Sequence, residues 1–450
     1  MASTREKRLI DHQGLVGKLA RAGYWSLLGA ILSRGITFLG AVLLARTLNI
    51  QGFGEFSIIQ STLSFLGVFS VAGFAITATK YVAQHRSISP TDASQYISVA
   101  LVLSLCSGVI VTVVTLLLAP EIANHAIGKK ELTDGILIAA PLTLFSAVTG
   151  VQTGVLIGLE DFRGVAIVNF SRAIAQLCLL LLGAIAWGLP GALGGMALGE
   201  AICMAVAGKV LKTARRILGT PEAGTKLEWE KLKRFVAFSF PAFLASIVTQ
   251  PAIWFSNLIL VRQPDGISAL AVFNAADRYR QMLLFLPISL APIVLAMLSN
   301  LHGSDTRREY GLVFRLSLVV TLATVLIPSI LIMALSSWFL GLFGESYQGG
   351  EWTLITLSAS SIFVALNTVL GQPLVSAGHM WWRFAMDALL AAALVVFSIV
   401  LVPTYRDVGL AASNLAAFGI TVGGLLLLRL KMPPGEMREE SPRVSLPAGK

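Results

Sequence analysis

The stretch YISVALVLSLCSGVIVTVVTLLLA, residues 96–119, contains no charged side chain and is long enough to cross a lipid bilayer. A helix rises about 1.5 Å per residue, so about 20 residues span a hydrocarbon core of roughly 30 Å. Eleven further apolar stretches lie near 24–44, 53–79, 134–158, 164–187, 190–212, 234–262, 267–299, 312–334, 351–376, 382–403 and 407–430. The sequence therefore predicts an all-α polytopic membrane protein with twelve transmembrane helices.

The composition agrees with a membrane protein. Apolar residues make up 55% of the chain and charged residues only 13%, which excludes most soluble functions. Glycine is frequent, with 41 of 450 residues, as close packing of helices in lipid requires. Because the spans leave little chain for a soluble domain, transport across the bilayer is the first function to consider.

Lysine and arginine gather on alternate loops. With the N-terminus inside, the inside segments hold 24 of the 34 basic residues, and the outside segments hold five, namely Arg46, Lys129, Lys130, Arg262 and Arg406. Positive charge favours the cytoplasmic side of a bilayer, so both termini are predicted to be cytoplasmic. The net charge of +10 follows from this topology, and no nucleic-acid partner is predicted.

The two halves of the chain resemble each other weakly. A shift of about 216 residues aligns the first six spans with the last six, and places 43–61 beside 260–278. Six is an even number, so both halves enter the bilayer from the same side, as two parallel six-helix repeats around a central cavity. The predicted organisation is a bundle over 1–212, a cytoplasmic linker over 213–233, a second bundle over 234–430 and a cytoplasmic tail over 431–450.

Three arginines lie deep inside predicted spans. Arg34 is about ten residues into the first span, and Arg278 and Arg280 lie about as deep in the eighth. Because a charge near the bilayer centre costs at least about 2.5 kcal/mol, each needs a reason to be there. Two readings stay open: Asp277 neutralises Arg278 or Arg280 in a structural pair, or at least one arginine faces a cavity and binds an anion.

Polar side chains also form stripes on equivalent spans of the two halves. Asn274, Asp277, Arg278 and Gln281 follow i, i+3, i+4, i+7 spacing on the eighth span, as do Ser57, Gln60, Ser61 and Ser64 on the second; Gln250 and Asn257 share a face of the seventh. Matching stripes predict a water-filled, V-shaped cavity between the halves, lined by spans 1, 2, 7 and 8.

Two isolated acids, Glu200 and Asp387, lie within spans. Each is either a protonatable coupling site or a partner for a nearby arginine. The three cysteines lie inside spans without metal-binding spacing, and the five histidines form no HExxH pattern, so no metal and no cofactor are predicted. The chain also has no GxxxxGK[ST] loop, which argues against direct ATP hydrolysis.

Two segments carry a family resemblance. WSLLGAILSRGITFLGAVLLARTLNIQGFGEFSIIQS (25–61) and GVLIGLEDFRG (154–164) resemble the Wzx-type polysaccharide flippases. That superfamily also contains multidrug and toxin extruders and the MurJ lipid II flippases. MurJ-like proteins usually have fourteen spans, so twelve favour the Wzx-type branch. The resemblance extends over nearly the whole chain in span count and topology.

The resemblance implies a function. Such proteins move undecaprenyl-diphosphate-linked oligosaccharides to the outer leaflet of the bacterial cytoplasmic membrane by alternating access, for surface polysaccharides such as lipopolysaccharide. An ion gradient or the membrane potential drives them, and polysaccharide polymerase machinery is a candidate partner beside the lipids. Arginine suits phosphate because its fork makes two hydrogen bonds. The candidate substrate-binding residues are Arg34, Arg278, Arg280, Asn274, Gln281, Gln60, Gln250 and Asn257; Asp277, Glu200 and Asp387 are candidate coupling or charge partners.

Three other functions compete with this reading. A multidrug antiporter of the same fold exports mostly cations, so it would favour acidic cavities. A membrane-embedded oligosaccharide ligase or polymerase usually needs a sizeable outside loop, whereas every outside loop here is short. A scaffold for polysaccharide assembly would need no arginine inside the membrane. A transporter, and not an enzyme, is therefore expected.

Overall fold

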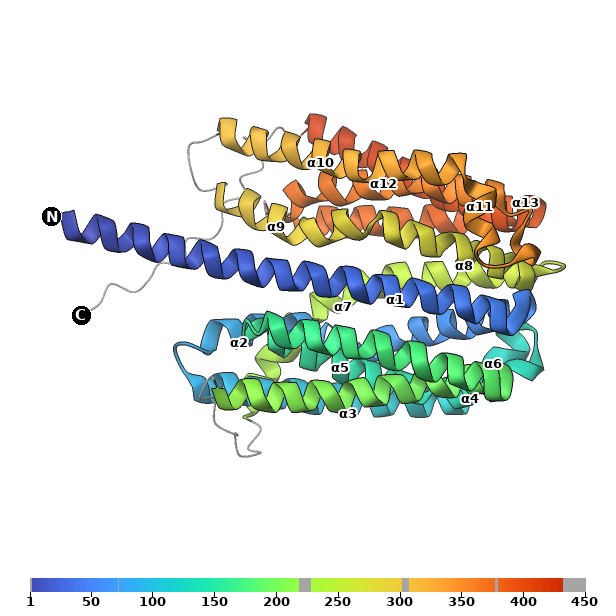
Figure 1. Ribbon diagram of the computed structural model, residues 1–450, viewed down its shortest axis with the longest axis horizontal. Coiled ribbons are helices and arrows are strands. Elements are labelled where there is room, and N and C mark those ends of the chain that lie inside the picture. The colour runs from blue at the N-terminus through green and yellow to red at the C-terminus, as the bar shows by residue number, and fades with distance from the viewer. Residues whose placement is uncertain (1, 72, 218–227, 302–306, 377–378, 432–450) are drawn as a thin grey trace. The chain divides into compact units, whose positions relative to one another are not determined.

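The computed structural model describes residues 2–71, 73–217, 228–301, 307–376 and 379–431 (Figure 1). Every regular element within these ranges is a helix. The chain forms two compact units, Met1–Gln250 and Pro251–Lys450, here called unit 1 and unit 2. The boundary between them falls inside a helix, so that helix contributes to both.

Unit 1 is built from six helices and the start of a seventh. They are α1 (Ala2–Val71), α2 (Phe74–His85), α3 (Pro90–Glu121), α4 (Thr133–Ala139), α5 (Pro141–Gly158), α6 (Phe162–Ile217) and α7 (Trp229–Val261). Short helical turns at Ile122–Ile127 and Lys130–Leu132 join α3 to α4. In Figure 1 the helices α3, α4, α5 and α6 run side by side.

Unit 2 takes the end of α7 and six further helices. They are α8 (Gly266–Leu283), α9 (Phe285–Leu301), α10 (Arg307–Ala334), α11 (Ser336–Gly341), α12 (Glu351–Ser376) and α13 (Met380–Lys431), with a short turn at Glu345–Tyr347. The most extensive packing within unit 2 is between α12 and α13. A cluster of buried side chains from α9, α10, α12 and α13 surrounds Leu298 and Phe314.

Three of these helices each contain a break. The backbone is non-helical at Asn49 in α1, at Trp187 and Gly188 in α6, and at Arg406 in α13. Asn49, Gly188 and Arg406 have positive φ values, which reverse the direction of a helix within one residue. All three breaks lie between stretches predicted as separate spans, so each of these helices contains two predicted spans. Figure 1 shows the chain of α1 turning back at its far end.

The helices of the described residues confirm an all-α membrane protein. Seven of them are long and apolar enough to cross a membrane, and three of the seven contain the breaks at 49, 187–188 and 406. The predicted count of twelve spans stays a prediction. Three of the predicted spans are interrupted: the stretch over 53–79 breaks at Gly73, that over 134–158 at Ala140, between α4 and α5, and that over 267–299 at Leu284.

Glycines bring the two halves of α6 into backbone contact. A Cβ atom added at Gly191 would lie 2.0 Å from the carbonyl oxygen of Gly183, and one at Gly195 would lie 2.1 Å from that of Leu179. Only residues without a side chain allow such an approach between helices in lipid. The close contact aligns polar residues on the facing surfaces of the hairpin, which matters for the site described below.

The start of α7 is fixed to unit 1 by charged and aromatic contacts. Lys231 Nζ lies 2.5 Å from Asp92 and 3.2 Å from Glu228, while Phe235 is buried beside Phe74. Burial lowers the pKa of Lys231, but hydrogen bonds to Asp92 and Glu228 outweigh it, so the net pKa is raised. This end of α7 therefore stays bound to α3 across the neutral pH range, because the ammonium stays charged.

The predicted domain limits stay predictions. The centre of the predicted linker 213–233, residues 218–227, lies outside the described residues, and so does the tail from 432. The residues 234–250, predicted to begin the second bundle, are grouped with unit 1 in the structure.

Candidate functional site

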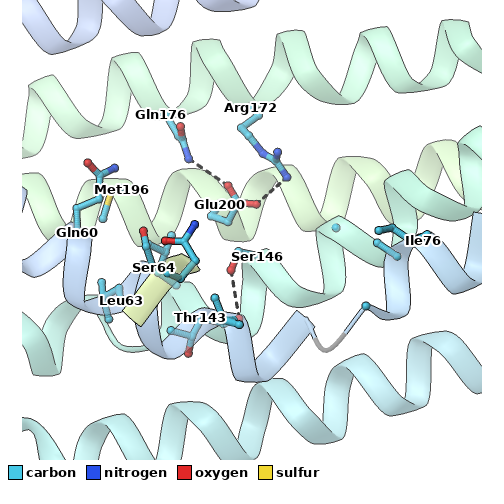
Figure 2. A pocket seen from close by; sticks show the side chains of 17 residues that line it. Gln60, Leu63, Ser64, Ile76, Thr143, Ser146, Arg172, Gln176, Met196 and Glu200 are labelled. Carbon is cyan, nitrogen blue, oxygen red and sulfur yellow. Dashed lines mark hydrogen bonds and ion pairs between the residues drawn. The ribbon is translucent and has the colours of Figure 1, made fainter. Parts of the chain in front are cut away.

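A polar cavity of about 590 Å³ lies inside unit 1 (Figure 2). Its wall is formed by α1, the start of α2, α5, both halves of α6 and α7. The lining side chains that carry polar atoms are Gln60, Ser64, Thr143, Ser146, Arg172, Gln176, Glu200 and Gln250. Gln60 and Gln250, which the sequence predicts as cavity-facing, therefore meet in one cavity. The predicted cavity between the halves stays a prediction.

Arg172, Gln176 and Glu200 form a hydrogen-bonded group on one wall of the cavity. Arg172 Nη2 donates to Glu200 Oε1 at 3.0 Å, and Gln176 Nε2 donates to Glu200 Oε2 at 3.1 Å. Figure 2 shows both side chains reaching toward the carboxylate from the facing half of α6. The Glu200 side chain is 3% exposed and that of Arg172 is 33% exposed. Both carboxylate oxygens of Glu200 therefore have a donor.

The hairpin of α6 places this group near the middle of the spans. Arg172 lies ten residues after Phe162, or about 15 Å along the helix, and Glu200 lies twelve residues after Gly188, or about 18 Å. These depths are about half of a hydrocarbon core of roughly 30 Å. A buried charge is tolerated there because its partner and a second donor replace water. Glu200 is therefore paired with an arginine, and a role as a coupling site stays a prediction.

The other walls supply hydroxyl groups and amides. Ser146 Oγ donates to the Thr143 carbonyl oxygen at 3.2 Å, on the side of α5 that faces the cavity. Gln60 is half-buried and Ser64 is exposed on α1. Ser57, from the same predicted stripe, is instead buried and donates to the Phe53 carbonyl oxygen at 2.7 Å. The stripe thus divides between the cavity and the core.

Unit 2 contains a second polar group, on α8 and α13. Arg280 donates from Nε to Asp277 Oδ1 at 2.6 Å, and Gln281 donates from Nε2 to Asp277 Oδ2 at 2.7 Å. Arg280 also reaches Asn414 Oδ1 on α13, at 3.4 Å. The structure therefore pairs Asp277 with Arg280, as the first of the two sequence readings expected. Asn414 was not among the predicted site residues.

The remaining predicted residues take no part in the hydrogen bonds described above for these two groups. Asp387 is paired with Arg383, one helical turn away, at 2.8 Å, and its role in coupling stays a prediction. Asn274 donates to its own helix at Leu270, and Asn257 is buried in unit 2. Arg278 is half-buried on α8.

Arg34 is exposed on α1, outside the core of unit 1. It is the predicted substrate-binding residue of the first span, and it does not line the cavity of unit 1. Its role as a substrate contact stays a prediction. Among the described residues, no group of three or more histidine, cysteine, aspartate or glutamate side chains is arranged to hold a metal ion.

Sequence reasoning missed the pair between Arg172 and Glu200, although a signal for it exists. The two residues are symmetric about residue 186, next to the break at Trp187 and Gly188. In an antiparallel hairpin, positions equidistant from the turn face each other. A tight turn between the fifth and sixth spans would therefore have indicated that an arginine in one span meets an acid in the other.

Comparison with known proteins places this architecture in a family. Residues 19–298, more than half of the chain, match the family described as polysaccharide biosynthesis protein. The chain belongs to the polysaccharide biosynthesis protein family. It is 24% identical over 409 residues to the EPS I polysaccharide export inner membrane protein EpsE of Ralstonia solanacearum, covering 88% of this chain and 87% of that one. It is 23% identical over 353 residues to a Shigella flexneri protein that carries the name O-antigen transporter, covering 75% and 80%.

Solved structures show the same fold for this member of the polysaccharide biosynthesis protein family. An inward-facing multidrug resistance MATE family transporter of the MOP superfamily matches with a TM-score of 0.76 at 14% identity, covering 92% of this chain and 99% of that one. The lipid II flippase MurJ in an inward closed conformation matches with a TM-score of 0.73 at 14% identity, covering 92% and 88%. The fold is therefore that of the MATE and MurJ transporters.

Proposed function

We propose that this member of the polysaccharide biosynthesis protein family is a flippase. It moves undecaprenyl-diphosphate-linked oligosaccharides from the cytoplasmic to the outer leaflet by alternating access. The observation that carries the proposal is the family match over residues 19–298, in a chain similar along most of its length to a polysaccharide export protein. The MurJ-like fold supports it, because the same architecture serves a lipid flippase.

The polar cavity of unit 1 supports movement of a hydrophilic group through the membrane. Its amides, hydroxyl groups and ion pair lie at about half the depth of the bilayer, where polar groups are expensive and mark substrate pathways. A ligase or polymerase would need reactive groups in a sizeable outside loop. The short outside loops of this chain favour a transporter over such an enzyme.

The proposal is tested with purified protein in vesicles. The substrate is lipid-linked oligosaccharide extracted from the organism that encodes the chain, and a membrane-impermeant reagent that oxidises sugar diols reports the leaflet. With protein present, the reagent should reach substrate from both leaflets within minutes; protein-free vesicles should expose only one leaflet. Equal exposure with and without protein would refute the function. The same assay is repeated with an imposed Na⁺ gradient, H⁺ gradient or membrane potential, and the condition that speeds translocation identifies the driving force.

We also propose that both termini lie in the cytoplasm of a bacterial cell. The excess of lysine and arginine on alternate loops supports this orientation. Single cysteines in place of Lys130 and Arg262 should react with an impermeant maleimide in intact cells, whereas a cysteine in place of Lys212 should react only after lysis. Lys130 and Lys212 lie on helical segments of unit 1, and Arg262 directly follows the end of α7. Labelling of position 212 in intact cells would contradict this orientation.

A further inference from the structure

The cavity of unit 1 carries no net charge. Arg172 and Glu200 are the charged residues among those that line it, and they bind each other at 3.0 Å. A diphosphate entering the cavity would meet the Arg172 guanidinium, but also the Glu200 carboxylate at hydrogen-bonding distance from it. In surroundings of low dielectric constant, repulsion by the carboxylate offsets much of the attraction by the guanidinium. The cavity therefore favours a neutral ligand over an anion.

The same pair disfavours a cation. Both oxygens of Glu200 accept a hydrogen bond, one from Arg172 and the other from Gln176. A metal ion would have to displace the Arg172 guanidinium, which already neutralises the buried carboxylate. A proton on one oxygen of Glu200 would remove the negative charge that pairs with Arg172 and would weaken the hydrogen bond accepted by that oxygen. Arg172, Gln176 and Glu200 therefore form a hydrogen-bonded polar surface and not a cation-binding site.

The groups that line the cavity match the hydroxyl groups of sugars. The amides of Gln60, Gln176 and Gln250 each carry donor and acceptor atoms, and the Ser64 hydroxyl can do both, whereas Ser146 Oγ, whose hydrogen is donated to Thr143, can accept. A sugar hydroxyl also donates and accepts, so it can pair with any of them. The volume of about 590 Å³ lies within the usual range for small-ligand sites, roughly 300–1,000 Å³.

Two glycines leave room beside the backbone. Gly67 on α1 and Gly150 on α5 line the cavity, and a Cβ atom added to either would meet no atom within 4 Å. A sugar ring can approach the helix backbone closely at such positions, because no side chain stands in the way. At these two positions the cavity wall is therefore helix backbone with open space beside it.

We propose that this cavity binds the uncharged sugar residues of the lipid-linked oligosaccharide and excludes its diphosphate. The inference rests on the proposed function and adds a subsite to it. Separate sites on the protein then recognise the sugar and the diphosphate of the substrate. Specificity for the glycan comes from unit 1, because neutral hydrogen-bonding groups can distinguish one pattern of hydroxyl groups from another.

The test fills the cavity without disturbing the fold. Gly150→Leu places an apolar side chain in the open space, and leucine also favours a helix more than glycine does. Gly150→Ala adds a single methyl group and serves as a graded second variant. Gly419→Leu in unit 2 is the matched control, since a Cβ there also meets no atom within 4 Å and the position does not line the cavity.

Binding is measured by native mass spectrometry of the full chain with two probes. One is lipid-linked oligosaccharide extracted from the organism that encodes the chain; the other is undecaprenyl diphosphate without sugar. The wild type should bind the first more tightly. Gly150→Leu should weaken that binding by roughly tenfold or more, the loss of about two hydrogen bonds, and leave the sugar-free lipid unchanged within about twofold. Gly150→Ala should lie between, and Gly419→Leu should match the wild type.

Each alternative outcome has a separate meaning. Equal affinity of the wild type for both lipids would overturn the sugar site, and so would an equal loss of both in Gly150→Leu. Unchanged binding of the oligosaccharide lipid in Gly150→Leu would overturn it as well. If the wild type binds the oligosaccharide lipid but does not move it in vesicles, the flippase function fails while the binding site stands. If it binds neither lipid, both proposals fail.

Discussion

Glu200→Ala should lower the free energy of unfolding by about 3 kcal/mol, the lower end of the range for breaking a buried ion pair. The alanine leaves the Arg172 guanidinium and the Gln176 amide without their acceptor, near mid-depth of the spans. The lower end applies because the Arg172 side chain is 33% exposed and can reach water in the cavity. Equilibrium unfolding in mixed micelles measures the loss.

Two further variants show whether the loss comes from the pair. Glu200→Gln keeps an oxygen for one of the two donors, so it should cost about half as much as alanine. Replacing both members, as Arg172→Met with Glu200→Leu, removes the unpaired charge and should recover most of the stability. If the double variant is as unstable as the sum of the two single variants, Arg172 and Glu200 act independently and the ion pair does not hold the hairpin of α6.

Much of the fold could be predicted from hydropathy, because length and apolar character decide whether a helix crosses a bilayer. The breaks at Asn49, Gly188 and Arg406 lie where the sequence placed loops between spans. The breaks at Gly73 and Leu284 were not predicted. Each lies inside a continuous apolar stretch, so hydropathy gives no signal for it.

The candidate site was harder to predict, since it depends on which helix faces meet. Gln60 and Gln250 were identified as cavity-facing from their spacing, and they line the cavity of unit 1. Periodicity shows which residues share a helix face, but not which other helix lies opposite. Asp387 and Asp277 have partners within one turn of their own helices, and such pairs can be read from the sequence. Asn414 is 134 residues from Arg280, and no local pattern connects them.

Arg34→Ala should reduce glycan export by at least about 100-fold, equivalent to about 2.7 kcal/mol in the barrier for translocation. We propose that Arg34 contacts the diphosphate, which cannot enter a core of low dielectric constant without compensating charge, because desolvation costs several kcal/mol per ion. Arg34 is exposed on α1 and lies in the middle of the first predicted span. Surface glycan on cells that lack their own flippase reports export, and immunoblotting reports the amount of protein in the membrane.

Arg34→Lys should restore export only in part, since lysine keeps the positive charge but loses the fork that makes two hydrogen bonds to phosphate. Arg163→Ala, which removes an exposed arginine at the start of α6, is the matched control and should export normally. In native mass spectrometry Arg34→Ala should weaken the binding of both lipids, because both carry the diphosphate, whereas Gly150→Leu should weaken only the lipid with sugar. Normal export by Arg34→Ala at normal protein level would make the arginine structural and would leave recognition of the diphosphate to other residues.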